Sequence, residues 1–317
     1  MNIKIASILS LFSVASFVSA QTSMSSMDIL GNLRILDDPN TTPIEGNVRI
    51  TGSLVVSDGA DAQAFATGRN SIAAGYRARS YGDYSIAIGG YDNAAQAFGL
   101  FNIAIGNGAV SGSAATPGSH NIAYGRWASA TGNYCSVAIG NFANASNTNS
   151  TALGYGAVGS GFAASAVGLE AEATHSYALG LGAGAKANGY RSGAVGFGAI
   201  AAQSGSFAAG YITESLGANS TAIGHYTVIN SPNSYAIGHR LNTEVVYEYI
   251  IGYYNELTTG NVSAWVATDP LFVIGNGRGE TTRSNALVML KNGDTSFAGT
   301  IKAKPSNALP MGNFGRL

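Results

Sequence analysis

The sequence predicts an all-β protein in which the chain coils into a parallel β-roll, or solenoid, of fourteen-residue repeats. The first observation is a recurring motif, Ser-x-Ala-x-Gly, whose glycines lie fourteen residues apart, as in Ser206-Phe-Ala-Ala-Gly210, Ser220-Thr-Ala-Ile-Gly224 and Ser234-Tyr-Ala-Ile-Gly238. The second is an alternation of small and larger residues with a period of two, which is typical of strands. Repeats of this kind indicate stacked units rather than separate globular domains.

The composition agrees with a thin fold. Only 10% of the 317 residues are charged, 43 are glycine, and the apolar fraction of 46% is largely alanine. Such a chain cannot fill a wide core, but it can fill a narrow one. The formal net charge of −1, with scattered signs, gives no electrostatic field for nucleic acid, so we expect no nucleic-acid partner.

Residues 1–20 have the layout of a secretory signal peptide. Lys4 precedes an apolar run from about Ile5 to Val18, and Val18-Ser19-Ala20 offers a small-residue cleavage site. No later segment approaches the ~18 consecutive apolar residues of a membrane-spanning helix. We therefore expect an exported protein without a transmembrane helix.

Residues 21–63 read as a leader. The segments 29–36 and 46–56 alternate apolar and polar residues on either side of the turn-forming Asp38-Pro39-Asn40. We expect short strands here that start or cap the array, because an end coil would otherwise expose unpaired backbone groups.

The repeat array covers residues 64–252. Small residues also occur three and five positions after each repeat glycine, as at Ala171 and Ala173 after Gly168. Each unit is therefore predicted to hold two short strands whose small residues point inward, because two strands so close in sequence enclose nothing bulkier than alanine. About thirteen coils advancing by roughly 4.8 Å each would make an array on the order of 60 Å long.

The larger residues of the motif are predicted to point outward. Examples are Ile86 and Ile88, Val137 and Ile139, and Ile223. In a monomer they would form a continuous apolar stripe far larger than the few hundred Å² that soluble monomers usually expose. The sequence therefore predicts that copies of the chain associate.

The coils between Gly89 and Gly140 break the strict period. Their glycines are separated by seventeen, nineteen and fifteen residues, and the longest excess includes Ser111–Ser119, where Pro117 indicates a turn outside any strand. Surplus residues in a repeat usually emerge as loops, and such loops often carry the binding function.

Residues 253–317 are expected to form a β-rich cap and tail. The segments Pro270–Gly277, Asn285–Leu290 and Asp294–Ile301 read as strands separated by glycine and asparagine turns. The tail after them contains Pro305 and Pro310 and carries no strand pattern.

These motifs resemble the head of trimeric autotransporter adhesins of the YadA type. The resemblance covers about residues 64–252, and Asn219-Ser-Thr-Ala-Ile-Gly224 and Asn233-Ser-Tyr-Ala-Ile-Gly238 are close to the repeat of that family. In that family the repeat builds a left-handed parallel β-roll, and three rolls pack about an axis. The resemblance implies the same fold, a homotrimer and an adhesive role. We find neither the heptads of a stalk nor strands of a membrane anchor, so we expect a secreted protein or one held at the surface by an unidentified partner.

Tyr211, His225 and His239 are the candidate partner-binding residues. Each directly follows a repeat glycine, so they are expected to stack one coil apart in a column with Tyr155, Phe197 and Tyr253. The column is either an exposed ladder that binds a partner or a position that merely tolerates large side chains at a turn or interface. Two histidines without a nearby carboxylate or thiol are too few for zinc unless subunits combine theirs, so no metal site is predicted.

No catalytic or cofactor-binding residues are predicted. Gly154-Tyr-Gly-Ala-Val-Gly159 matches a phosphate-binding string, but the repeat continues where a helix would have to follow. Glu170 and Glu172 are expected on one face of one strand, where like charges keep edges from pairing. Nothing near Cys135 would activate its thiol.

The sequence therefore favours an exported, non-enzymatic surface adhesin whose partner is a protein or glycan on a host or neighbouring cell. The alternative is a receptor-binding fibre of a phage-like particle, which the signal peptide disfavours. An enzyme on a β-solenoid, such as a polysaccharide lyase, would need longer coils and clustered carboxylates.

Overall fold

The computed structural model describes residues 54–56, 64–90 and 92–300. Contacts divide the chain into Met1–Ile50 and Thr51–Leu317, and every described residue lies in the second unit. The predicted signal peptide, nearly all of the predicted leader and the C-terminal tail lie outside the described residues. Within them the chain forms strands and turns and no helix.

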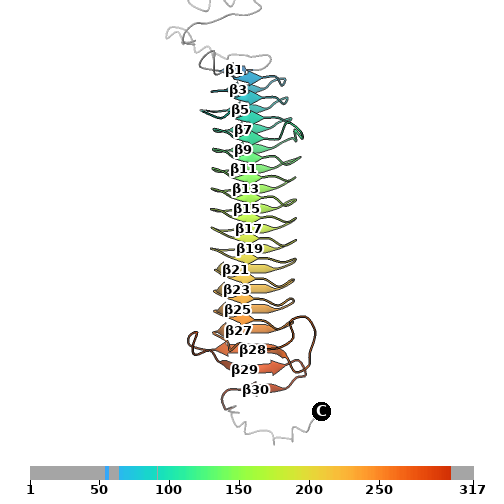
Figure 1. The fold of residues 1–317 in the computed structure, drawn as a ribbon, viewed down its shortest axis with the longest axis vertical. Coiled ribbons are helices and arrows are strands. Elements are labelled where there is room, and N and C mark those ends of the chain that lie inside the picture. Colours follow the sequence, from blue (N-terminus) through green and yellow to red (C-terminus); the bar gives the residue numbers. More distant parts are fainter. Residues whose placement is uncertain (1–53, 57–63, 91, 301–317) are drawn as a thin grey trace, which may run out of the picture. The chain divides into compact units, whose positions relative to one another are not determined.

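Two sheets share the coils, and each coil gives one strand to each sheet (Figure 1). The first sheet contains β1 (Leu54–Val56), β3 (Ile72–Ala74), β5 (Ile86–Ile88), β7 (Ile103–Ile105), β9 (Ile122–Tyr124), β11 (Val137–Ile139), β13 (Thr151–Leu153), β15 (Ser165–Val167), β17 (Leu179–Leu181), β19 (Gly193–Val195), β21 (Phe207–Tyr211), β23 (Thr221–His225), β25 (Tyr235–His239), β27 (Tyr249–Tyr253), β28 (Pro270–Asn276), β29 (Asn285–Leu290) and β30 (Thr295–Phe297). The second sheet contains β2 (Phe65–Ala66), β4 (Arg79–Ser80), β6 (Gln96–Ala97), β8 (Val110–Ser111), β10 (Ser129–Ala130), β12 (Asn144–Ala145), β14 (Val158–Gly159), β16 (Glu172–Ala173), β18 (Lys186–Ala187), β20 (Ile200–Ala201), β22 (Glu214–Ser215), β24 (Val228–Ile229) and β26 (Asn242–Thr243).

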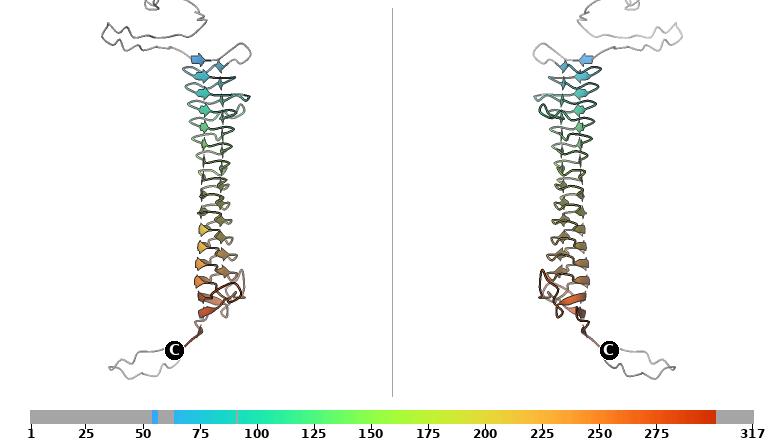
Figure 2. Two further views of the ribbon diagram at one scale, coloured as in Figure 1. Left: turned by 90° about the vertical axis from the view of Figure 1, so that its left-hand side faces the viewer. Right: turned by 90° about the vertical axis from the view of Figure 1, so that its right-hand side faces the viewer.

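Each strand pairs in parallel with its copy in the next coil. In β23 and β25, for example, Ala222 lies opposite Ala236, fourteen residues further on. The views in Figure 2 show this stacking of coil on coil from two sides. The predicted parallel roll of fourteen-residue repeats is confirmed, and β1 adds the last residues of the predicted leader to the first sheet through its pairing with β3.

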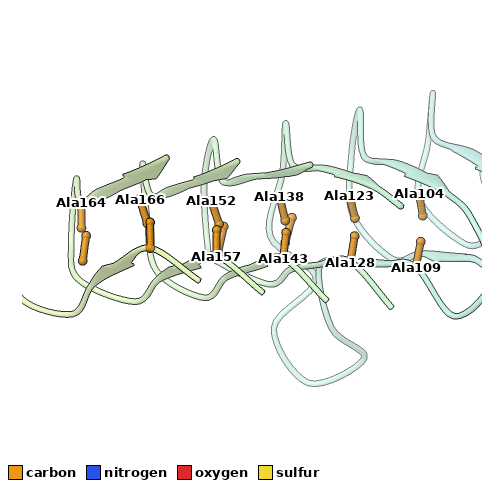
Figure 3. Packing of buried hydrophobic residues seen from close by; sticks show 14 of the residues in the cluster. Ala104, Ala109, Ala123, Ala128, Ala138, Ala143, Ala152, Ala157, Ala164 and Ala166 are labelled. Atoms are coloured by element: carbon orange, nitrogen blue, oxygen red, sulfur yellow. The ribbon is translucent and has the colours of Figure 1, made fainter. Parts of the chain in front are cut away.

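Alanine fills the space between the sheets. The middle residue of each three-residue first-sheet strand from β3 to β19 is buried. It faces small residues in or directly before the second-sheet strands, as Ala104 faces Ala109 and Ala138 faces Ala143 (Figure 3). The inward direction of the small residues is therefore as predicted. The offset coil follows the same rule, because Gly180 occupies the alanine position between Ala166 and Ala194.

The core widens from β21 onward. There the first-sheet strands lengthen from three to five residues. Ile229, Leu241, Ile250 and Val273 are buried in this part of the core, beside the alanines that β21, β23 and β25 retain. This change in the core was not predicted from the sequence, although the larger residues at these positions could have indicated it.

The serine and the glycine of the motif have separate tasks. The buried serine hydroxyl donates to a carbonyl three residues earlier, as from Ser220 Oγ to Gly217 O at 2.6 Å, and so closes the turn. The glycine has a positive φ, +137° at Gly224, which L-residues rarely adopt. A Cβ at Gly224 would lie 1.7 Å from Gly238 O, so the glycine also allows the next coil to approach.

The long coils between Gly89 and Gly140 keep their strands in register and release the surplus residues as loops. Residues 112–118 form the largest loop, and Pro117 lies outside any strand, as predicted. Asn102 and Asn121 replace the motif serine in these coils and are fully buried. The Asn102 amide donates to Ser111 O and Pro117 O, so a longer polar side chain spans the longer turn.

The first sheet continues beyond the last regular repeat. Strand β28 pairs in parallel with β27 and places Gly275 opposite Gly252, and β29 and β30 then follow in antiparallel order. Residues 254–269 separate β27 from β28. The three predicted C-terminal strands are therefore present, and the first of them completes one more rung of the array.

Candidate functional site

The ladder comprises the five residues that follow successive repeat glycines: Phe197, Tyr211, His225, His239 and Tyr253. The rings from Phe197 to His239 stack nearly parallel, with centroids 5.3, 5.0 and 4.9 Å apart and interplanar angles of 12° to 14°. Tyr253 is tilted, at 6.1 Å from His239. The predicted stacking of the three candidate residues is therefore present, and their role in binding stays a prediction.

A second row of side chains lies beside the ladder. Tyr226 meets His225 edge-on at 4.6 Å, and Tyr254 meets His239 edge-on at 5.1 Å. Between them, the Arg240 guanidinium lies 4.5 Å from the centre of the Tyr226 ring, at the distance of a cation–π contact. The three residues of this row have positive φ between 40° and 52°, which turns the chain sharply and holds the second row against the first.

Charged residues link the His239 end of the ladder to the turn between β28 and β29. Glu280 bonds Arg240 at 2.6 Å and Arg283 at 2.5 Å, and Arg283 also donates to Arg240 O and Asn255 O. Burial lowers the pKa of His239, and the nearby His225 and Arg240 lower it further. His239 therefore favours its neutral form next to this group of cations.

The ladder borders a shallow apolar groove on the outer side of the first sheet. The groove is lined by Gly224, His225, Ile237, Gly238, His239, Gly252 and Tyr253. Parallel imidazoles one coil apart, with apolar neighbours, suit stacking contacts rather than coordination. Among the described residues, no group of three His, Cys, Asp or Glu side chains could hold a metal ion.

The groove lies at one edge of a longer apolar face, which is formed by the first and third side chains of the first-sheet strands from β3 to β27. Ile88, Ile139, Leu181, Ile237 and Ile251 are each at least 38% exposed. The outward direction of the larger residues is therefore as predicted.

The outer side of the second sheet is different. It carries Arg79, Gln96, Asn144, Glu172, Lys186 and Glu214 among its outward residues, and Glu172 and Lys186 of adjacent coils form an ion pair at 3.1 Å. The two sides of the roll thus differ in polarity, one apolar and one mixed with charge.

A second ladder, which was not predicted from the sequence, lies at the turns that precede the first-sheet strands. Tyr84, Phe101, His120 and Tyr134 follow one another with ring centroids 5.1 Å apart. The signal in the sequence was the residue before the motif serine or asparagine, which is aromatic at Tyr84, Phe101 and His120. The fourth was obscured because the extra residue of its coil, Cys135, takes the usual position of the aromatic residue.

The remaining sequence candidates show no assembled chemistry. Gly154–Gly159 runs from the end of β13 into β14, so the repeat continues through the glycine string. Glu170 is not on a strand with Glu172, contrary to expectation, because it occupies the turn before β16 with φ +51°. Cys135 is a half-buried free thiol.

Comparison with known proteins identifies the repeat. The family model of the YadA head domain repeat matches in two copies, at residues 66–91 and 136–157. The crystal structure of the collagen-binding domain of the Yersinia adhesin YadA is similar at 21% identity over 75% of this chain and 94% of that chain, with a TM-score of 0.21. No curated protein matches. The matched stretches form regular coils of the parallel roll, so these coils are YadA-type head repeats.

None of the residues that the structure describes forms a helix able to cross a membrane.

Proposed function

We propose that the chain is an exported surface adhesin that assembles as a homotrimer through the apolar face of its first sheet. The observation that carries this proposal is the difference between the two sides of the roll. An apolar strip that runs from coil to coil exposes more than a soluble monomer usually tolerates. Packing against other copies would remove it from water, while the charged side of the second sheet stays solvated.

The number of copies is taken from the YadA-type repeats, whose family forms trimers. Export would use the predicted signal peptide at residues 1–20, and an unidentified partner would hold the protein at the cell surface. Attachment to a host or neighbouring cell would use the turns at the two edges of the roll, where the two ladders and the 112–118 loop lie. Weak contacts repeated over coils and copies gain strength by avidity.

The assembly is tested by measuring the molar mass of the mature protein in solution by light scattering. We expect three times the chain mass for the wild type. Ile237→Glu should lower the mass to that of a monomer, because it places a charge in the apolar face. Val228→Glu makes a comparable change on the outer side of the second sheet and should leave the trimer intact. A monomeric wild type would contradict the proposal.

Attachment is tested by binding the purified protein to host matrix, to glycans and to cells that carry the same protein. One variant replaces Tyr211, His225 and His239 by alanine. A second removes only residues 113–116, because Ser111 is buried and Pro117 O accepts from Asn102. Loss of binding in either variant, with the trimer intact, assigns the surface used. No binding by the wild type to any of these surfaces would contradict an adhesive role.

A further inference from the structure

Asp269 and Lys291 lie side by side at one end of the β28–β29 hairpin. Asp269 directly precedes β28 and Lys291 directly follows β29, and the last strand pair joins Pro270 to Leu290. The Lys291 backbone N–H donates to Asp269 O at 2.9 Å. The two backbones are therefore held at a fixed separation, and the two side chains extend from neighbouring positions.

The two side chains meet away from water. The Lys291 side chain is fully buried, the Asp269 side chain is 10% exposed, and Nζ lies 3.6 Å from Oδ2. That distance is too long for a hydrogen bond, and Lys291 Nζ has no hydrogen-bond partner among the described residues. The Trp265 ring covers the amine, with its centre 5.3 Å from Nζ. A buried ammonium without hydrogen bonds is expensive, so an ordinary ion pair explains this arrangement poorly.

The loop before β28 is shaped to enclose the Asp269 carboxyl. The Asn261 backbone N–H donates to Oδ2 at 2.9 Å. A Cβ at Gly260 would lie 2.9 Å from Cγ of Asp269, so the glycine lets the backbone approach the carboxyl carbon. A backbone donor at this oxygen would stabilise negative charge that develops there when the carbonyl carbon is attacked.

Glu248 completes the buried group. It occupies the motif serine position of the last regular coil, is fully buried, and accepts hydrogen bonds from Thr243 and, at 2.7 Å, from Thr258. Burial raises the pKa of Glu248 to about 7, and the charges of Lys291 and Asp269 also act on it. This carboxyl can therefore hold and release a proton near neutral pH, and it lies within electrostatic reach of the other two groups.

We propose that Lys291 and Asp269 join in an intramolecular isopeptide bond that forms without another enzyme. The reaction starts with transfer of one proton from Nζ to the Asp269 carboxylate, which gives the amine and the carboxylic acid. The Nζ lone pair attacks Cγ of Asp269, the N–Cγ bond forms, and one Cγ–O bond breaks. Glu248 accepts a proton from the nitrogen and returns it to the departing hydroxyl, so one water molecule leaves and no oxidant or reductant is needed.

The bond would close a covalent ring around the β28–β29 hairpin. Tension between the coils and any residue beyond Lys291 would then pass from Lys291 directly to Asp269. The hairpin would carry no load and would not peel from β27. This consequence suits a surface protein, although the proposal itself is independent of adhesion or trimer formation.

The test is the mass of the purified wild-type protein, followed by tandem mass spectrometry of a tryptic digest. We expect a branched peptide that links Asp269 to Lys291, lighter by one water than its two parts, and no cleavage after Lys291. Lys186 and Glu172 provide an internal control, because their ion pair is shorter, 3.1 Å, but partly exposed to water. Unlinked peptides at both sites would overturn the proposal and leave an ion pair only.

Variants separate the roles of the three residues. Lys291→Arg and Asp269→Ala should abolish the branched peptide. Glu248→Gln keeps the side-chain volume but removes the titrating carboxyl. We expect this variant to contain a smaller fraction of linked protein than the wild type at matched times after cell-free synthesis. That fraction should also no longer depend on pH. Glu256→Gln, at an exposed position nearby, should match the wild type. A Glu248→Gln chain that forms the bond as fast as the wild type at every pH would overturn the proton-transfer role of Glu248. If some variants fail to fold, the wild-type protein still decides, because a wild type without the bond contradicts the proposal.

Discussion

The repeat glycine is the residue that tolerates least change. Its positive φ and its contact with the next coil are separate requirements, and only glycine meets both. The same contact recurs along the array, since a Cβ at Gly210 would meet Gly224 O and one at Gly238 would meet Gly252 O, at 1.7 and 2.0 Å. A side chain at one glycine therefore disturbs two adjacent coils.

Gly224→Ala should lower the free energy of unfolding by at least about 3 kcal/mol, from backbone strain and displacement of the next coil. Thermal or urea denaturation of the purified protein measures this. Gly299→Ala is the matched control, because no atom lies within 4 Å of its added Cβ. Equal stability of the two variants would contradict the role of the glycine contact.

The buried asparagines of the long coils act at the scale of single elements. Asn121 donates to Gly132 O at 2.8 Å, and its Oδ1 accepts from both the backbone N and the Oγ of Ser136. It therefore joins the turn of one coil to the first strand of the next. A serine at this position would match the regular motif, but its shorter side chain could not reach both Gly132 and Ser136.

Asn121→Ser should destabilise the protein by about 2 kcal/mol, because it leaves buried groups of Gly132 and Ser136 without partners. Chemical denaturation measures the change. Asn133→Ser, at an exposed position in the same coil, is expected to change stability by less than about 0.5 kcal/mol. If the two variants unfolded alike, Asn121 would not be needed to hold the long coils together.

At the scale of the whole molecule, the ladder gives the array a dependence on pH. The pKa of His239 is lowered, chiefly by burial, so the folded protein binds this proton less readily than the unfolded chain. Stability should therefore fall as the pH drops through the ordinary histidine pKa of 6.5 towards the lowered value. Because His239 borders the apolar face, the same proton would also oppose packing between copies.

His239→Gln should reduce the loss of stability on acidification from about pH 7.5 to about pH 5, because the uncharged amide takes up no proton. Thermal melts at the two pH values, with the molar mass recorded in parallel, give the comparison. His175→Gln, an exposed imidazole outside the ladder, should keep the wild-type response. A His239→Gln protein as sensitive to acid as the wild type would contradict this origin of the pH dependence.

The sequence by itself determined the coil length, the two strands in each coil and the direction of the motif side chains on the regular strands. These properties follow from local regularities, because a period of two assigns each strand residue to a face, and the small residues at most inward positions limit the width of the roll. The stacking of Tyr211, His225 and His239 followed for the same reason. Residues fourteen apart occupy equivalent positions in successive coils.

Only the tertiary structure decided the contacts that lie outside the regular repeat. The ladder through Tyr134 depends on how one surplus residue is absorbed, and the roles of Asn102 and Asn121 depend on where the long turns fold back. The meeting of Glu248, Asp269 and Lys291 depends on the path of residues 254–269 between β27 and β28. No repeat specifies these contacts, since each joins residues at unrelated spacings, and they form only when burial and chain geometry bring those residues together.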